Sequence, residues 1–170
     1  MASSPTVTRS HRDGTIVVKD GTGTPKSVTV HCDDGNLTWT VTYGVTQKRC
    51  RGVATGHVKA DDVFCTGSFT AQWTQLIAVS GATNELYEML TDYDEDVFAS
   101  TTSNGVYTLD IEFSVVDPSD PTGAADTGEK ITFADAVITS VVPAEGEVNK
   151  ITVNFEIPAV KPTIARIVVA

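Results

Sequence analysis

Residues 107–115 read Tyr-Thr-Leu-Asp-Ile-Glu-Phe-Ser-Val, with an apolar side chain at every second position. Because successive side chains of a β-strand point to opposite faces, this period of two predicts a strand with one buried face and one solvated face. The alternation returns in residues 15–20, 27–32, 37–43, 63–73, 131–142 and 151–157. The sequence therefore predicts a mainly β (α+β) fold, an antiparallel β-sandwich or flattened barrel of about seven strands.

Two stretches modify this pattern. Asp33-Asp34-Gly35-Asn36 is a strong turn signal and predicts a hairpin between residues 27–32 and 37–43. Within residues 131–142 the alternation breaks after Asp135, which predicts a β-bulge. Trp39 and Trp73 fall on the apolar faces of their strands, and we expect both in the core.

One helix is predicted after the strand that ends near residue 73. Leu86, Met89 and Leu90 recur at helical spacing, and Thr83 or Asn84 can cap the helix. The apolar stripe indicates a helix that packs on the core. The acidic run Asp92-Tyr93-Asp94-Glu95-Asp96 follows it.

Residues 44–62 show no alternation and are predicted to be a long loop. At roughly 19 residues the segment exceeds the usual loop length, and loops of this kind are typically functional or disordered. The segment holds five basic side chains, Lys48, Arg49, Arg51, His57 and Lys59.

The chain is acidic overall, with a formal net charge of −10, but the charge is unevenly distributed. Residues 1–60 hold eight basic and four acidic side chains, whereas residues 61–170 hold four basic and 18 acidic ones. An acidic chain is a poor binder of nucleic acid, because that affinity comes mainly from cations that displace phosphate counterions. This uneven charge distribution suits self-association, in which a positive patch of one copy meets a negative patch of another. A need for solubility alone also explains the acidic surface.

Metal and disulfide sites have little support. The three cysteines, Cys32, Cys50 and Cys65, lack the paired spacing of a disulfide framework or a zinc site, and fit a reducing compartment. We expect Cys32 and Cys65 to be small core residues on strands. Asp117, Asp120 and Asp126 could hold calcium, but the spacing is not that of an EF-hand and a solvated loop explains them.

Catalytic motifs are equally weak. Asp126-Thr127-Gly128 spells the aspartic-protease triplet, but hydrophobic strands do not flank it, and that chemistry needs a buried, apolar setting. His11, His31 and His57 are scattered, and no GxSxG or GxGxxG stretch occurs. We therefore expect no enzyme, no catalytic residue and no cofactor.

The chain organisation is expected to be one domain. Residues 1–13 form a leader without the apolar stretch of a secretory signal, residues 14–157 form the β domain, and residues 158–170 form an arm with an apolar end. No apolar run is long enough to span a membrane. The arm needs cover, from its own domain or from a neighbouring subunit.

Hydroxyl and amide side chains dominate the predicted solvent faces of two strands. These are Thr38, Thr40, Thr42, Thr66, Ser68, Thr70 and Gln72. A sheet with open edges must cover them or join them to others, and one solution closes several copies into a shared barrel.

Two stretches resemble a known family. Residues 14–25, Gly-Thr-Ile-Val-Val-Lys-Asp-Gly-Thr-Gly-Thr-Pro, and residues 35–40, Gly-Asn-Leu-Thr-Trp-Thr, look like the opening of tailed-bacteriophage tail tube (major tail) proteins. Ala136-Val137-Ile138-Thr139-Ser140, the turn at 145–147 and residues 148–157 resemble the ending. The resemblance covers most of residues 14–157 but not the arm.

The resemblance implies a structural virion protein that assembles in the host cytoplasm into stacked hexameric rings. Each subunit would give four strands to an inner barrel, and ~24 strands at ~4.8 Å spacing form a barrel with a backbone diameter of at least ~37 Å. Duplex DNA would be a cargo that is not bound, and tape measure, terminator and distal tail proteins would be partners.

The family's long loop reaches the next ring, and residues 44–62 occupy its position. The resulting hypothesis is an inter-ring contact in which Lys48, Arg49, Arg51, His57 and Lys59 meet Asp92, Asp94, Glu95 and Asp96. The alternative function is a monomeric immunoglobulin-like or carbohydrate-binding β-sandwich module of a virion or surface protein.

Overall fold

The computed structural model describes residues 14–30, 36–59, 64–73, 75–77, 85–92, 97–103, 105–116, 128–159 and 161–167. These residues form one helix, α1 (Leu86–Thr91), and ten strands. The strands are β1 (Thr15–Lys19), β2 (Ser27–Val30), β3 (Thr38–Val41), β4 (Val45–Cys50), β5 (Val53–Lys59), β6 (Cys65–Gln72), β7 (Thr108–Val116), β8 (Gly128–Ala144), β9 (Lys150–Ile157) and β10 (Thr163–Ile167). The mainly β prediction is confirmed, and β4, β5 and β10 are the strands that the alternation did not predict.

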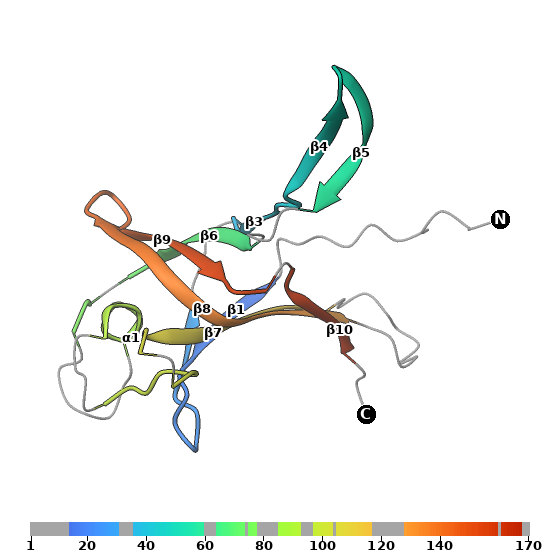
Figure 1. The fold of residues 1–170 in the computed structure, drawn as a ribbon. Coiled ribbons are helices and arrows are strands. Elements are labelled where there is room, and N and C mark those ends of the chain that lie inside the picture. Colours follow the sequence, from blue (N-terminus) through green and yellow to red (C-terminus); the bar gives the residue numbers. More distant parts are fainter. Residues whose placement is uncertain are drawn as a thin grey trace, which may run out of the picture.

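Eight strands form one antiparallel sheet that folds over on itself (Figure 1). The order is β2-β1-β7-β8-β9-β6-β3, with β10 paired to β8 beside this path. The long strand β8 belongs to both halves: residues 128–137 pair with β7, and residues 137–144 pair with β9. Phe133 of the first half packs edge-on against Phe155 and Trp39 of the second, with ring centroids 5.1 and 5.9 Å apart. The two halves therefore enclose one core.

The predicted bulge at Asp135 is confirmed. Leu109 pairs with Ala136 and Ile111 with Phe133, so two β8 residues face Asp110 of β7. Asp135 has a positive φ of 54°, and its N–H donates to Oδ1 of Asp110 at 3.0 Å. A second register shift follows in β8 between residues 138 and 140. Because bulges increase local twist, these two irregularities let β8 pass from one half of the sheet into the other.

The hairpin predicted between residues 27–32 and 37–43 is wrong. β2 pairs with β1, and β3 pairs with β6, so β2 and β3 are the two end strands of the sheet. The chain between β2 and β3 therefore connects the two halves, and residues 31–35, with Cys32 and most of the turn signal, lie outside the described residues. A turn motif specifies local chain reversal only, and the partners of a strand are set by packing over the whole core.

The helix packs on the core as predicted, with Leu86, Met89 and Leu90 buried. Its N-cap is Glu85, without a side-chain capping bond, rather than Thr83 or Asn84, which lie outside the described residues. The Tyr107 hydroxyl donates to the Met89 carbonyl at 2.8 Å. Burial, together with the nearby carboxylates of Asp92 and Asp20, raises the pKa of Tyr107 well above its ordinary value, so the phenol stays a donor at neutral pH.

The core face of β6 is filled as its alternation predicts. Cys65, Phe69 and Ala71 are buried, and burial raises the pKa of the Cys65 thiol. At Gly67, on the same face, a Cβ would lie 2.3 Å from the ring of Phe155, so the missing side chain makes room for that phenylalanine. Trp39 differs from the prediction: it lies at the rim of the core and is 36% exposed.

Asp20 is a buried carboxylate that organises the turn between β1 and β2. It is 2% exposed, and its Oδ1 accepts from the Lys26 N–H at 2.7 Å, the Thr22 hydroxyl at 2.9 Å and the Thr22 N–H at 3.4 Å. Its Oδ2 accepts from the Ala99 N–H at 3.3 Å. The neighbouring Gly21 N–H donates to the Ala99 carbonyl at 2.7 Å. The turn is therefore tied to the segment that follows the helix.

Part of the predicted arm pairs with the sheet. β9 ends at Ile157 before Pro158, but the chain then pairs again as β10 along residues 128–132 of β8. Ile164 of β10 remains 61% exposed.

Candidate assembly surface

The second half of the sheet carries a polar face with almost no charge. It spans β3, β6, β9 and residues 138–144 of β8, and the register places its side chains opposite one another. The members with hydroxyl or amide groups are Thr38, Thr40, Thr66, Ser68, Thr70, Gln72, Ser140, Thr152 and Asn154. Lys150 and Glu156 are the charged residues of the described face. We call this surface the hydroxyl face.

The side chains of the hydroxyl face bond to one another. The Thr38 and Ser68 hydroxyl oxygens lie 3.0 Å apart, and Asn154 Nδ2 donates to Ser140 Oγ at 2.7 Å. Thr70 and Thr152 make a longer contact of 3.4 Å between strands. These contacts satisfy part of the hydrogen-bonding capacity internally, so the face offers fewer groups to a passing molecule.

Asn36 extends the ladder beyond β3. Its side chain accepts from the Thr70 N–H and donates to the Thr70 carbonyl, both at 3.1 Å. These two side-chain hydrogen bonds take the place of the backbone hydrogen bonds that one more residue of β3 would make to β6. They hold the start of β3 against β6.

Both borders of the hydroxyl face are open among the described residues. β3 pairs with β6 on one side only, and residues 138–144 of β8 pair with β9 on one side only. Unpaired strand edges recruit further strands, from the same chain or from another. The two borders could therefore join copies edge to edge.

A shallow depression of about 210 Å³ lies on the hydroxyl face beside Trp39. Thr40, Thr66, Asn154 and Glu156 contribute to its wall. The depression lies beside the second register shift of β8.

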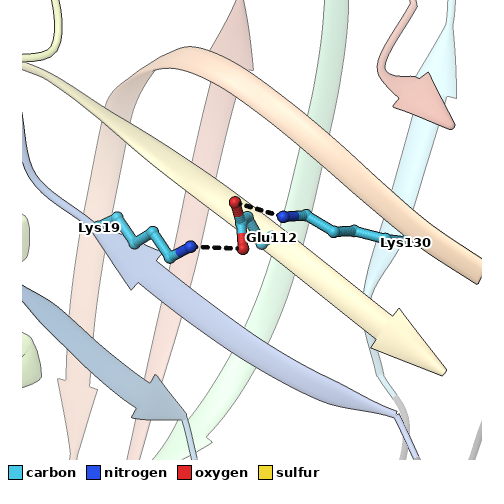
Figure 2. A network of polar contacts seen from close by, with 3 residues as sticks. All are labelled: Lys19, Glu112 and Lys130. Atoms are coloured by element: carbon cyan, nitrogen blue, oxygen red, sulfur yellow. Dashed lines mark hydrogen bonds and ion pairs between the residues drawn. The ribbon is translucent and has the colours of Figure 1, made fainter. Parts of the chain in front are cut away.

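The outer face of the first half has different chemistry, because it is ion-paired (Figure 2). Glu112 of β7 lies between Lys19 of β1 and Lys130 of β8, and each lysine Nζ is 2.7 Å from a different carboxylate oxygen. Partial burial raises the pKa of Glu112, but hydrogen bonds and the charges of Lys130 and Lys19 outweigh it, so the pKa lies below its usual value. The two solvent faces of one sheet thus carry charge pairs on one half and hydroxyls on the other.

Removing the Glu112 carboxylate should cost about 1 kcal/mol at neutral pH, because both lysines lose their partner. A lowered folded pKa means that this stability is present above the ordinary glutamate pKa and is lost as the pH falls through the folded value. Urea unfolding at pH 7 and pH 3 should show a smaller acid loss in Glu112→Gln than in the unaltered chain. Glu145→Gln, in an exposed turn, serves as the control and should keep the full acid loss.

The predicted loop at residues 44–62 is instead an exposed β-ribbon. β4 and β5 form their own two-stranded sheet, which projects from the body (Figure 1). Every described side chain of the ribbon is exposed. Arg51 and Gly52 have φ values of 50° and 84°, the pattern of a two-residue type I′ turn. The alternation was missing because neither face of this ribbon is buried.

The predicted basic residues lie along this ribbon. Lys48 and Arg49 belong to β4, Arg51 to the turn, and His57 and Lys59 to β5. Arg49 Nε donates to the Gln47 side chain at 3.0 Å. Residues 43–59 contain four lysine or arginine residues and no acid, so the ribbon carries a single sign of charge.

Of the predicted acidic partners, Asp92 lies at the end of α1, whereas Asp94, Glu95 and Asp96 lie outside the described residues. The ribbon begins beside Cys65 and Ile157, and α1 lies near Gln72 and Trp73, at the other end of β6. Within one copy, Asp92 therefore lies at the end of the sheet opposite the base of the ribbon. Sequence reasoning missed Glu145 and Glu147, in the turn between β8 and β9 at that same acidic end.

Other kinds of site find no support in the part of the chain that the structure describes. Its residues form no cluster of three or more His, Cys, Asp or Glu side chains close enough to hold a metal ion. The described helix is too short to cross a membrane. Cys50 is exposed and Cys65 is buried, both as free thiols, and the loop with Asp117, Asp120 and Asp126 lies outside the described residues.

Comparison with known proteins identifies the fold. No protein-family model and no curated protein matches the sequence. A chain of the anti-feeding prophage tube-terminating cap aligns with a TM-score of 0.55 and 13% identity over 98% of this chain and 94% of its own. A chain of the six-fold symmetrised baseplate of that particle gives 0.54 and 11% over 96% and 97%. A chain of the sheath-tube complex of PVC, an extracellular contractile injection system, in its extended state gives 0.53 and 11% over 89% and 88%. The chain thus has the fold of components of contractile injection systems.

Proposed function

We propose that this protein is a structural subunit of a phage-type tail or injection tube, and that its copies join edge to edge into a ring. The observation that carries the proposal is the hydroxyl face, a four-stranded polar surface with an open strand at each border. In this arrangement β3 of one copy pairs with residues 138–144 of β8 in the next. The likeness to chains of a tube-terminating cap, a baseplate and a sheath-tube complex supports it.

The number of strands fits a six-membered ring. Six copies with four strands each close a barrel of roughly 24 strands, whose backbone diameter is at least about 37 Å before strand tilt widens it. The six-fold symmetry of the baseplate to which one related chain belongs supports the same ring size. A channel of this width admits duplex DNA.

The chemistry of the hydroxyl face suits a channel that does not retain its cargo. Lysine or arginine in excess would bind phosphate and slow passage, whereas this face has one charge of each sign. Hydroxyl groups that already bond to one another compete weakly for a passing molecule. We propose duplex DNA as the cargo of the ring, and a role without catalysis.

The ribbon would join one ring to the next. Its basic side chains lie at one end of the hydroxyl face and acidic groups lie at the other, so rings stacked in one direction bring opposite charges together. Other tail proteins would bind the ends of the stack. Such a subunit would be a virion component, assembled in the cytoplasm of the host.

Electron microscopy of the purified full chain tests the proposal. We expect hollow rings and stacks, in which the inner barrel has a backbone diameter of about 40 Å. Monodisperse monomers at high concentration in low salt would contradict it.

Reversing the ribbon charge with Arg49→Glu and Arg51→Glu should shorten the stacks and leave the rings intact. Exposed ion pairs are individually weak, at about 0–1 kcal/mol, but they repeat around each ring, so the effect multiplies. The measurement is the distribution of stack lengths at rising salt, with Lys161→Glu in the C-terminal segment as the control. Stacks of unchanged length and salt tolerance would rule out the charge contact.

One observation favours the alternative function, a carbohydrate-binding module. Trp39 is 36% exposed beside a polar depression, and sugars stack on aromatic rings. Titration of a glycan panel into the unaltered chain and Trp39→Ala decides between the two. Binding that Trp39→Ala abolishes in a monomeric protein would favour the module.

A further inference from the structure

We infer that the turn of the ribbon, Cys50-Arg51-Gly52-Val53, inserts into a hollow beside α1 of a second copy of this chain. The inference rests on the proposed function and names the surface that receives the ribbon. Of the acidic run at residues 92–96 it keeps Asp92 alone, and the other partners are described below.

The hollow lies at the end of the sheet opposite the ribbon. The ribbon leaves the body next to Cys65, the first residue of β6, which pairs with Ile157, the last residue of β9. At the other end of β6, the Trp73 N–H donates to the Asn149 carbonyl at 3.2 Å. One length of β6, about 26 Å at strand spacing, therefore separates the base of the ribbon from the hollow. A copy cannot fill its own hollow with a ribbon that projects from the far end.

The hollow has a volume of about 340 Å³ and both apolar and polar lining residues. Val28, Trp73, Leu86 and Val148 are apolar members of the lining, and Gln75 and Glu85 are polar members. Val148 is 44% exposed. Glu85 accepts a hydrogen bond from Gln75 Nε2, which holds the carboxylate in place. Such a site takes an apolar side chain accompanied by a cation.

The turn of the ribbon offers that combination. Val53 is 66% exposed, the most exposed of the large apolar side chains in the described chain, and it follows Arg51 and Gly52 directly. The type I′ turn is narrow, because both of its central residues have positive φ. A two-stranded ribbon alone is marginally stable in water, so an ordered ribbon gains from a surface that holds its end.

Charge favours the same pairing. Residues 85–92 hold Glu85, Glu88 and Asp92 and no base, and the adjacent residues 145–150 hold Glu145 and Glu147 against one base, Lys150. The ribbon holds four bases and no acid. The contact joins different surfaces of the two copies, so it is heterologous, and between stacked rings it repeats in one direction along the axis. Ring closure uses other edges, so the two contacts are independent.

The exposed thiol of Cys50, at the start of the turn, makes the docking measurable. In Val148→Cys the new thiol lies on the wall of the hollow, and oxidation should link it to Cys50 of the next copy when the Cα atoms come within about 7 Å. We expect at least about tenfold more disulfide-linked ladder on a non-reducing gel than in the unaltered chain. Val142→Cys, exposed on the hydroxyl face, is the matched control. The double variant Val148→Cys with Cys50→Ser lacks the ribbon thiol that this disulfide requires.

The outcomes separate the inference from the proposed function. A ladder in Val148→Cys that is absent from Val142→Cys and from the Cys50→Ser double variant supports the docking. Stacked rings by microscopy without that ladder overturn the docking and leave the tube intact. A ladder of equal strength in Val142→Cys places the ribbon elsewhere and also overturns it. Absence of any assembly overturns the proposed function and the docking together.

Discussion

Asp20→Ala is expected to lower the free energy of unfolding by about 3 kcal/mol, since buried donors left unsatisfied cost about 1–3 kcal/mol each. The Asp20 carboxylate accepts from two N–H groups of its own turn, from the Thr22 hydroxyl and from the Ala99 N–H. Alanine removes every one of these acceptors at a site that is 2% exposed. The turn would also lose its tie to the segment after α1. Urea unfolding followed by tryptophan fluorescence measures the loss.

Asp20→Asn is the matched control for this prediction. The amide keeps an oxygen for the three bonds at Oδ1 and replaces Oδ2 with a donor that cannot accept from Ala99. We expect a loss of about 1 kcal/mol, well below that of alanine. Equal losses in both variants would show that the charge, rather than the acceptor geometry, stabilises the turn. An alanine variant as stable as the unaltered chain would refute the role of Asp20.

Replacing residues 45–59 with two glycines should abolish stacking and leave the body folded. β4 and β5 form a separate sheet, and their described side chains are exposed, so their loss should change the free energy of unfolding by no more than about 1 kcal/mol. By electron microscopy, we expect isolated rings where the unaltered chain gives stacks. The loss of stacking should exceed that caused by Arg49→Glu with Arg51→Glu, because the turn and its apolar Val53 are lost along with the basic side chains.

Circular dichroism and a urea midpoint establish whether the shortened chain has folded. A folded variant that still forms long stacks would contradict the role of the ribbon. A variant that does not fold would show instead that the ribbon supports the body, contrary to its separation in the structure.

The sequence was sufficient to predict the strands that have one buried face. Alternation marks such strands because burial sorts side chains by face, and β6 and residues 109–115 of β7 follow it. The bulge at Asp135 was also predictable, because an extra residue shifts the phase of the alternation. The ribbon was not, since both of its faces meet solvent and burial imposes no pattern. Its remaining signal was Arg51-Gly52 between stretches rich in valine and threonine.

Pairing partners were harder to predict than the strands. A strong turn at residues 33–36 suggested that β2 and β3 are neighbours, yet they end on opposite borders of the sheet. The crossing depends on β8, whose length and two register shifts let one strand serve both halves. Such a property belongs to the whole core, and a local motif does not contain it. The hollow could not be predicted from local sequence either, because α1, β2 and the turn at residues 145–149 are distant from one another in the chain.

In the proposed stack, the opposed placement of the ribbon and the hollow would give the two ends different surfaces. One terminal ring would present bare ribbons with unneutralised arginine and lysine, and the other would present empty acidic recesses. A single capping protein cannot close both: one terminus needs a partner with a recess, the other a partner with a basic plug. Nucleation and termination would then require different proteins, and elongation would proceed with a fixed direction.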